Sequence, residues 1–255
     1  MRNYFELKGK VALVTGASSG LGVQFAKALA SQGADIIIAA RRLERLEQVK
    51  KDVEELGVKC LAVKCDVGKV ADVVAMVEKA KSQFGKIDIL VNNAGVAGFA
   101  PADMQTDKEW LHIIDINLNA LYYVTREVGK LMLEKGYGRV INIGSVASVM
   151  AVKGTPLSAY NASKGAVEML TKSLASEWAT RNITVNCIGP GYFMSEMTEN
   201  IMDSPEFGTT IKTYCPMERP GGEGELDTAL LFFASELSAY VTGQMLCVDG
   251  GMTAI

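Results

Sequence analysis

Short runs of nearly continuous apolar residues alternate along the chain with longer segments of helical periodicity. The runs cover residues 11–15, 35–40, 60–67, 88–95, 139–145, 183–191 and 244–251, and the helical segments cover residues 20–32, 43–56, 69–84, 107–135, 158–180 and 224–236. Strands that are apolar on both faces are typical of a parallel sheet with helices packed on each side. The alternation therefore predicts an α/β fold, a doubly wound parallel sheet of about seven strands in a single domain over residues 1–255.

Composition excludes several classes of protein. Apolar residues make up 49% of the 255 residues, and a formal net charge of −3 gives no basic surface for nucleic acid or for an anionic membrane. No run has the pattern of a signal segment or the length of a membrane span. With five scattered cysteines and one histidine, we expect no metal site, no disulfide framework and a cytoplasmic location.

One segment, residues 192–223, shows no clear periodicity. It contains four methionines, three prolines and several glycines. An irregular segment of this length inside a compact domain is usually functional. We therefore expect a substrate-binding loop at about 192–223.

The first apolar run ends in a glycine-rich turn, TGASSGLG, which leads directly into a helical segment. Gly16, Gly20 and Gly22 let the backbone turn tightly and approach a pyrophosphate, and the first N–H groups of the helix favour an anion. Such a turn could simply close a strand–helix unit, and its spacing, TG-x-x-x-G-x-G, differs from the common G-x-G-x-x-G. The strand before it and the helix after it favour a dinucleotide site.

Tyr160 and Lys164 lie four residues apart in the stretch SAYNASKGAV, a spacing that places both side chains on one face of a helix. The pair could be an ordinary surface contact. It could also be a phenol whose acidity is tuned by an ammonium group, because a nearby cation lowers the pKa of a phenol from its usual value of about 10.

Several motifs occur together in one order along the chain. They are TG-x-x-x-G-x-G after the first run, NNAG at 92–95, the group Ser145, Tyr160 and Lys164, and PG at 190–191. In this order the chain resembles the short-chain dehydrogenase/reductase family from about Lys8 to Gly251. The resemblance implies a Rossmann-type fold and an NAD(P)-dependent oxidoreductase that interconverts a secondary alcohol and a ketone. It also implies a homotetramer built through the helices around 107–135 and 158–180 and the C-terminal segment.

The same resemblance assigns the proton chemistry to Tyr160 and Lys164. Tyr160 would give or take the hydroxyl proton as general acid or base, and Lys164 would lower the pKa of Tyr160 and hold the nicotinamide ribose. The positive charge of an oxidised nicotinamide would lower the phenol pKa further. The reading of a simple surface pair is thereby disfavoured.

Two further catalytic residues are expected. Ser145 ends the fifth run, where its hydroxyl can orient the substrate oxygen, and Ser148 or Ser158 could take its place. Asn117, within DINLNAL, resembles the family's fourth catalytic residue, which holds a water that links the lysine to solvent. Asn119 is the competing choice for that position.

The end of the second run decides between the two nicotinamide cofactors. A carboxylate there would bind the adenosine ribose hydroxyls, but this sequence has Ala39 and Ala40 followed by Arg41 and Arg42. Because arginine holds phosphate through several charge-assisted hydrogen bonds, we expect NADP(H), with Arg41 as first choice and Arg42 as second. The alternative is that both arginines lie on a solvated helix surface. The neutral Ser19 leaves NAD(H) possible.

The resemblance, together with the turn and the ends of the apolar runs, implies the contacts to cofactor and substrate. Those to the cofactor are Gly16, Ser18, Ser19, Gly20, Leu21, Gly22, Arg41, Arg42, Asp66, Val67, Asn93, Ala94, Gly95, Tyr160, Lys164, Pro190, Gly191, Phe193 and Ser195. Those to the substrate are Val96, Ser145, Met150, Tyr160, Tyr192 and Met197. Asp66 can also cap the helix that follows it. The single histidine, His112, lies among apolar residues of a helical segment and is expected to be structural.

The substrate is the least constrained part of the prediction. Apolar residues such as Val149, Met150 and Phe99 favour a bulky ketone, and a hydroxysteroid is the expected substrate. The alternatives are a gluconate-type sugar acid, whose carboxylate would need a cation such as Lys153 or Lys212, and a 3-oxoacyl group on a carrier protein. A catalytically silent dinucleotide sensor is an alternative of another class, but the presence of both Tyr160 and Lys164 argues against it.

Overall fold

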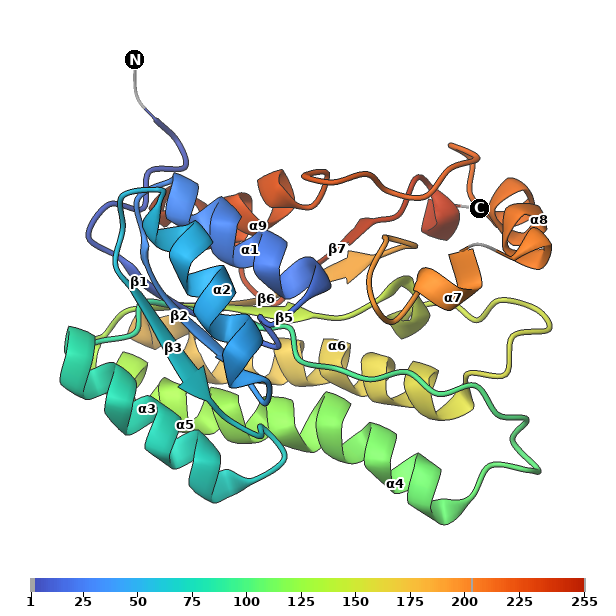
Figure 1. Cartoon of the computed structure of the whole chain (residues 1–255), viewed down its shortest axis with the longest axis horizontal. Coiled ribbons are helices and arrows are strands. Elements are labelled where there is room, and N and C mark those ends of the chain that lie inside the picture. Colours follow the sequence, from blue (N-terminus) through green and yellow to red (C-terminus); the bar gives the residue numbers. More distant parts are fainter. Residues whose placement is uncertain (1–2, 203, 255) are drawn as a thin grey trace.

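The computed structural model describes residues 3–202 and 204–254. Its strands form one parallel sheet in the order β3-β2-β1-β4-β5-β6-β7, with helices on both faces (Figure 1). The strands are β1 (Val11–Thr15), β2 (Asp35–Ala40), β3 (Cys60–Lys64), β4 (Ile89–Asn92), β5 (Gly138–Ile143), β6 (Ile183–Pro190) and β7 (Met245–Val248). The structure confirms the predicted fold, a seven-stranded Rossmann-type sheet flanked by helices.

Two groups of helices cover the sheet (Figure 1). One face packs against α1 (Gly20–Ser31), α2 (Leu43–Glu54) and α9 (Asp227–Ala234), and the other packs against α3 (Val70–Phe84), α5 (Ala120–Lys135) and α6 (Ser158–Trp178). Because β1 lies in the middle of the sheet, its side chains enter both cores. Ala12 and Val14 pack on the α1 side, whereas Val11 and Leu13 pack on the α3 side. This two-sided burial explains why the runs are apolar at consecutive positions.

No helix within residues 3–202 and 204–254 has both the length and the apolar character needed to cross a membrane. The long helices owe their apolar residues to the two cores instead. Each large side chain that is fully buried there, such as Phe25 of α1 or Met76 of α3, stabilises the fold by roughly 1.5–3 kcal/mol.

The long helical segment predicted at 107–135 is interrupted. Helix α4 (Asp107–Ile114) passes through a π-helical turn at Asp115–Asn119 before α5 begins. Asn117 lies in that turn with its side chain fully buried. Short π-helical turns often mark functional sites, because the extra residue re-aims a side chain out of the regular helix.

The segment 192–223 is more regular than the sequence predicts. It contains α7 (Glu199–Met202) and α8 (Pro205–Tyr214), which lie beyond one end of the sheet (Figure 1); position 203 is outside the described residues. Ser204 Oγ accepts a hydrogen bond from Phe207 N at 3.1 Å and thereby caps α8. The Ser-Pro pair at the start of α8 was a signal for a helix start that the missing apolar periodicity obscured.

The order of the strands leaves a crevice beside β1. The chain runs from β1 to β2 and β3 on one side, and then crosses over to place β4 on the other side of β1. The segments that leave β1 and β4 therefore diverge at the carboxyl end of the sheet, which is where doubly wound folds bind ligands. The glycine turn after β1 and the NNAG segment after β4 lie on either side of this crevice.

A chain of buried polar side chains joins the sheet to the helices beneath the crevice. Asn92 Nδ2 of β4 donates to Thr125 Oγ1 at 2.7 Å and to Asn142 Oδ1 of β5 at 2.9 Å. Asn142 Nδ2 in turn donates to Thr171 Oγ1 of α6 at 2.9 Å. Because buried amides are costly when unpaired, this chain fixes β4 and β5 relative to α5 and α6.

Replacing Asn142 tests that role. We expect Asn142→Leu to lower the free energy of unfolding by about 1–3 kcal/mol, because Asn92 loses its acceptor inside the protein. Urea unfolding followed by circular dichroism measures the change. Asn119→Leu, which removes only a solvent-exposed hydrogen bond to Asp115, serves as the comparison, and equal effects of the two substitutions would contradict the role of the buried chain.

Candidate active site

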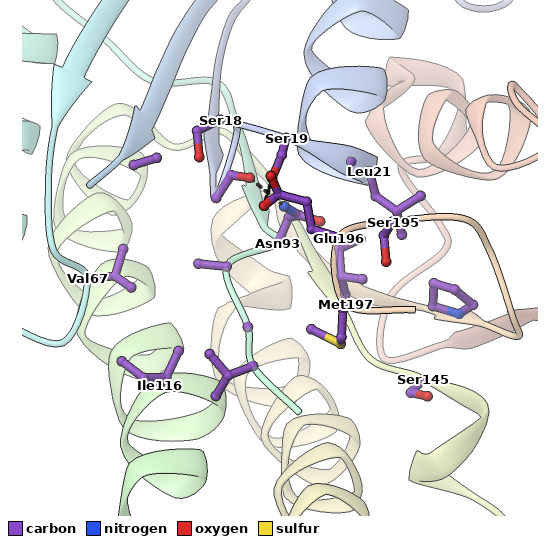
Figure 2. Close-up of a pocket in the computed structure, with 18 of the residues that line it drawn as sticks. Ser18, Ser19, Leu21, Val67, Asn93, Ile116, Ser145, Ser195, Glu196 and Met197 are labelled. Carbon is purple, nitrogen blue, oxygen red and sulfur yellow. Dashed lines mark hydrogen bonds between the residues drawn. The ribbon is translucent and has the colours of Figure 1, made fainter. Parts of the chain in front are cut away.

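A cavity of about 310 Å³ opens at the carboxyl ends of the strands, between the glycine turn and the start of α6 (Figure 2). It brings together most of the residues predicted from the sequence. These are Gly16, Ser18, Ser19, Gly20, Leu21, Arg41, Arg42, Asp66, Val67, Asn93, Ala94, Gly95, Val96, Ser145, Tyr160, Lys164, Pro190, Gly191, Phe193, Ser195 and Met197. Most of the predicted cofactor and substrate contacts therefore line one continuous cavity.

Four of the predicted residues lie outside the cavity lining. Gly22 lies under the glycine turn, and Asn117 lies behind Val96. Met150 and Tyr192 pack in an apolar cluster with side chains of α8. The ring of Tyr192 meets that of Phe207 edge-on, with centroids 4.9 Å apart.

The glycine turn fits a diphosphate-bearing cofactor. Gly16 has a φ of +67°, and a Cβ there would lie 2.8 Å from Ala94 Cα, whereas a Cβ on Gly22 would lie 2.4 Å from Gly16 O. Only glycine allows this close approach of β1, α1 and the segment after β4. Ser19 precedes α1, but its side chain makes no capping hydrogen bond, so it leaves the first N–H groups of that helix to an anion.

Thr15, which we did not include among the site residues, holds the two sides of the crevice together. Its Oγ1 accepts hydrogen bonds from Asn93 N at 3.1 Å and Ala94 N at 3.2 Å. Asn93 Nδ2 donates back to Thr15 O at 3.0 Å. The threonine of the TG pair was visible in the sequence, but its partners lie 78 and 79 residues further along the chain.

Tyr160 and Ser145 meet at the inner end of the cavity, where β5 ends and α6 begins. Ser145 Oγ accepts a hydrogen bond from Ala147 N at 3.1 Å, which leaves the hydroxyl proton of Ser145 free to point elsewhere. Burial raises the pKa of the Tyr160 phenol above its usual range, and the hydrogen bond with Ser145 opposes that shift in part. Burial and this hydrogen bond both act on the Tyr160 hydroxyl, which belongs to a residue that lines the cavity.

Lys164 lies one helical turn after Tyr160 and is only 6% exposed. Its Nζ donates to Ile143 O at 2.8 Å and lies 5.7 Å from the centre of the Tyr160 ring. Burial lowers the pKa of Lys164 to about 8, which makes the amine able to exchange a proton near neutral pH.

These shifts correct one expectation. The sequence predicted that Lys164 lowers the pKa of Tyr160, but the pKa of Tyr160 is raised in the structure. The reason is that desolvation acts on both groups, so it disfavours the phenolate and also weakens the positive charge that was expected to stabilise it.

Asn117 uses its side chain to position the segment after β4. Its Oδ1 accepts from Val96 N at 2.8 Å, and its Nδ2 donates to Val96 O at 2.9 Å and to Ser163 Oγ at 3.0 Å. A Cβ on Gly95 would lie 3.3 Å from Asn117 Oδ1 and 3.7 Å from Lys164 Nζ, which places both groups around that glycine. Asn117 thus lies near Lys164, but its side chain bonds to Val96 and Ser163, and the predicted water link stays a prediction.

The two arginines after β2 differ in their contacts, although both line the cavity. Arg42 Nη2 donates to Ser18 Oγ at 3.1 Å, to Ser19 Oγ at 2.9 Å and to Glu196 Oε2 at 2.8 Å. Arg41 is exposed and makes no hydrogen bond with any described residue. The geometry therefore favours Arg42, the second choice from the sequence, as the guanidinium that lies at the glycine turn.

Glu196 is a site residue that the sequence gave no means to find. It lies in the irregular segment before α7, and it also accepts a hydrogen bond from Arg45 of α2, 151 residues earlier in the chain. These hydrogen bonds, with Arg42 first, lower the pKa of Glu196 to about 2. No local spacing could reveal a contact between residues so far apart.

No metal-binding group emerges from the described residues, since no three His, Cys, Asp or Glu side chains among them gather around one point. His112 is exposed on α4 and does not line the cavity. Ser145, Tyr160 and Lys164, in contrast, all line it.

A doubly wound sheet with a glycine-lined crevice and a Ser-Tyr-Lys group at its inner end defines a nicotinamide-dependent oxidoreductase. Residues 16–253 match the family model described as Enoyl-(Acyl carrier protein) reductase. The chain is 39% identical over 249 residues to the gluconate 5-dehydrogenase of Gluconobacter oxydans (strain 621H), covering 98% of this chain and 96% of that protein. It is 40% identical over 253 residues to the 2-dehydro-3-deoxy-D-gluconate 5-dehydrogenase of Bacillus subtilis (strain 168), covering 98% and 97%.

A solved structure extends the likeness to three dimensions. The gluconate 5-dehydrogenase from Burkholderia cenocepacia J2315, in complex with NADP and tartrate, matches with a TM-score of 0.95 at 36% identity, covering 99% of this chain and 98% of that chain. The protein belongs to the short-chain dehydrogenase/reductase family and is an oxidoreductase, as the ordered motifs indicated. The alternative of a silent dinucleotide sensor is not supported.

The relatives do not support the expected hydroxysteroid substrate. The Gluconobacter and Bacillus enzymes are named for gluconate and for its 2-dehydro-3-deoxy derivative. Three of the apolar side chains that favoured a steroid lie outside the cavity lining. Met150 packs under α8, while Val149 and Phe99 are 52% and 51% exposed.

The burial of the Lys164 ammonium leads to a testable prediction about the free energy of unfolding. Its pKa falls from 10.5 to about 8, which corresponds to roughly 3 kcal/mol of destabilisation at pH 7. Replacing Lys164 by methionine would remove this destabilisation, but it would also remove the hydrogen bond to Ile143 O, which costs about 1–2 kcal/mol. We therefore expect Lys164→Met to be about 1–2 kcal/mol more stable than the wild type at pH 7.

The pH dependence identifies the cause. Between pH 8 and pH 10.5 the unfolded chain keeps the Lys164 proton while the folded chain releases it, so wild-type stability gains with rising pH in this window. The advantage of Lys164→Met should shrink by up to about 1.4 kcal/mol per pH unit above pH 8. Urea unfolding at pH 7, 8 and 9 measures it, and an advantage that is constant with pH would refute the buried charge as its source.

Proposed function

We propose that this protein interconverts a secondary hydroxyl group and a ketone on a sugar acid, with NADP(H) as cofactor. The observation that most strongly supports the reaction is the meeting of Ser145 and Tyr160 beside the buried amine of Lys164 at the inner end of the cavity. The names of the bacterial relatives, which match over nearly their whole length, support the substrate class.

Tyr160 is the proton donor or acceptor in this proposal. In the reducing direction its hydroxyl gives a proton to the carbonyl oxygen, and in the oxidising direction the phenolate takes the alcohol proton. Its raised pKa keeps the proton on Tyr160 at neutral pH, which suits it to act as the acid in ketone reduction. When bound, the nicotinamide accepts the hydride from the substrate carbon or supplies it.

Ser145 orients the substrate oxygen. Because Ala147 N already donates to Ser145 Oγ, the hydroxyl proton of Ser145 is directed toward other acceptors in the cavity. A hydrogen bond from Ser145 would stabilise negative charge on the substrate oxygen as the carbonyl is reduced. Ser148, the competing choice, donates its proton to Lys164 O at 2.8 Å and is therefore unavailable.

Lys164 and Asn117 restore the proton. A pKa of about 8 allows Lys164 to deliver a proton toward Tyr160 and to take one from solvent without a large free-energy difference. Nζ uses one of its protons on Ile143 O, which leaves the others for ribose hydroxyls or water. Asn117 positions the backbone of Val96 beside this amine, where a water link to solvent would lie.

Arg42 supports the preference for NADP(H). It lies at the adenosine end of the cavity, where Ser18 and Ser19 hold its guanidinium beside the glycine turn. No carboxylate lies at the carboxyl end of β2 to bind the ribose hydroxyls, since that strand ends in Ala39 and Ala40. The Burkholderia relative with the same fold is described with NADP bound.

Polar groups around the reacting end of the cavity support a hydroxylated substrate. Ser145 and Tyr160 face it, and the pKa of Tyr192 is raised by burial first and by the nearby Tyr160 hydroxyl second. The segment 192–223 would then act as the substrate loop, because it supplies Met197 to the cavity lining and places Tyr192 close enough to Tyr160 to interact with it electrostatically. Lys153 and Lys212 lie outside the cavity lining and are not proposed as carboxylate ligands.

A substrate panel tests this function. With NADPH we expect reduction of 5-keto-D-gluconate with a kcat/KM at least about ten-fold above that for a 3-oxoacyl thioester or a 3-ketosteroid. Tyr160→Phe should lower kcat by about 10²–10⁴-fold and leave the dissociation constant of NADPH within about two-fold, because only the proton donor is removed.

The panel has two outcomes that would overturn the proposal. Faster turnover of the steroid or the thioester would reject the sugar-acid class and leave the reaction intact. Substantial turnover by Tyr160→Phe would reject the assignment of the proton donor, whichever substrate is preferred.

Arg42→Ala tests the choice of cofactor. Loss of charge-assisted hydrogen bonds should weaken NADPH binding by about 10- to 100-fold while NADH changes by less than about three-fold. Arg41→Ala is the matched control and should change either cofactor by less than about three-fold. Fluorescence titration measures both, and a larger selective loss in Arg41→Ala would restore the order that the sequence favoured.

The homotetramer and the cytoplasmic location expected from the sequence stay predictions. Exposed apolar side chains on the helices named for the interface, among them Leu111 of α4 and Met169 of α6, are available for contact with another copy. Light scattering after size-exclusion chromatography gives the assembly directly.

A further inference from the structure

We propose that Glu196 limits the preference for NADP(H) over NAD(H) by competing with the 2′-phosphate of NADP(H) for Arg45 of α2 and for Arg42 at its N-cap. The inference rests on the proposed function, because it takes the cavity between the glycine turn and Tyr160 to be the cofactor site. It assigns a role to a carboxylate that neither the motifs nor the catalytic group explain.

The Glu196 carboxylate accepts hydrogen bonds from several cationic and hydroxyl donors. Its Oε2 accepts from Ser19 Oγ at 2.9 Å and from Arg42 Nη2 at 2.8 Å, and its Oε1 accepts from Arg42 Nη1 at 3.2 Å and from Arg45 Nη1. The two arginines and one hydroxyl thus direct their protons at a single carboxylate. Figure 2 shows the Glu196 side chain reaching toward Ser19 at the start of α1.

The same donors match a phosphate monoester. Arginine forks and serine hydroxyls are the groups that bind phosphate oxygens through charge-assisted hydrogen bonds. Ser18 holds Arg42 through Nε at 3.3 Å and Nη2 at 3.1 Å, so the guanidinium is oriented before any anion binds. A carboxylate in this position therefore occupies the donors that a 2′-phosphate on the adenosine ribose would need.

Glu196 and a phosphate cannot share these donors. The hydrogen bonds that hold Glu196 also lower its pKa to about 2, so the side chain is ionised at any working pH and repels a second anion. NADP(H) must therefore displace Glu196, whereas NAD(H), which has no 2′-phosphate, can bind with Glu196 in place. The competition acts on one cofactor only.

Displacing Glu196 also involves the wall of the cavity. Thr198 Oγ1 donates to Phe193 O at 2.6 Å and accepts from Ser195 N at 3.0 Å, which ties residues 193–198 into one hydrogen-bonded turn. Ser195 and Met197 of this turn line the cavity on either side of Glu196. Displacement of Glu196 by a phosphate would therefore also move residues 193–198, which form part of the cavity wall.

The competition is weak enough to be overcome. The side chains of Glu196, Arg42 and Arg45 are 46%, 39% and 48% exposed, and an exposed ion pair changes an equilibrium by less than about five-fold. Two such pairs acting together would weaken NADP(H) binding by about three- to ten-fold. The effect is large enough to measure and small enough to leave NADP(H) the better ligand.

Glu196→Gln tests the proposal by fluorescence titration with NADPH and NADH. We expect NADPH to bind about three- to ten-fold more tightly, because the neutral amide no longer repels the phosphate, and NADH to change by less than about two-fold. Glu196→Ala should shift NADPH in the same direction. Titration with 2′,5′-ADP and 5′-AMP repeats the comparison without the nicotinamide, and only the phosphate-bearing nucleotide should gain.

Glu199→Gln is the matched control. Glu199 is an exposed carboxylate at the start of α7 that makes no contact with Arg42 or Arg45, and its substitution removes the same charge from the same segment. It should leave both cofactors within about two-fold of the wild type. An equal gain in Glu199→Gln would show that net charge, and not competition for the arginines, is responsible.

The outcomes separate this inference from the proposed function. Unchanged or weaker NADPH binding in Glu196→Gln, or equal gains for NADPH and NADH, would overturn the competition even if the wild type prefers NADPH and reduces a sugar acid. If the wild type shows no preference for NADPH and Arg42→Ala does not alter the ratio of the two affinities, the assignment of the phosphate site itself fails.

Discussion

The position of the site depends on the reversal of strand order between β1 and β4. In an all-parallel sheet, all strands run in the same direction. The segments that follow the strands therefore all emerge at the carboxyl end of the sheet. Because the order reverses between β1 and β4, the segments that follow these two strands run in opposite directions and leave a crevice between them at the carboxyl end of the sheet. Thr15 then binds the segment after β4 to the end of β1, and only Gly16 and Gly22 allow the close packing that results.

Electrostatics act in opposite ways at the two ends of the cavity. At the inner end, burial dominates, which raises the pKa of Tyr160 and lowers that of Lys164. At the outer end, Arg42 and Glu196 are partly exposed, so solvent weakens their attraction and a ligand can replace one partner. Desolvation thus governs the groups around Tyr160, and contacts weakened by solvent surround Arg42.

Most of the fold and the majority of the cavity lining could be predicted from local sequence. Apolar runs marked all seven strands, but the run at 88–95 overestimates β4, which ends at Asn92 because Thr15 draws the next residues out of the sheet. The break at Asn117 was foreseeable as an unfavourable helix residue, but its pairing with Val96 was not. Helices α7 and α8 escaped prediction because their stabilising contacts come from residues distant in the chain.

The sequence by itself determined the α/β class, the glycine turn and the placement of Tyr160 and Lys164 on one helix face, since each depends on residues within a few positions of one another. Tertiary structure decided how these residues behave. Burial set the direction of the pKa shift at Tyr160, which reverses the expectation from the lysine alone. Folding also brought Glu196 to Arg42 across 154 positions, because contacts of that range follow from the packing of whole elements and have no signature in local spacing.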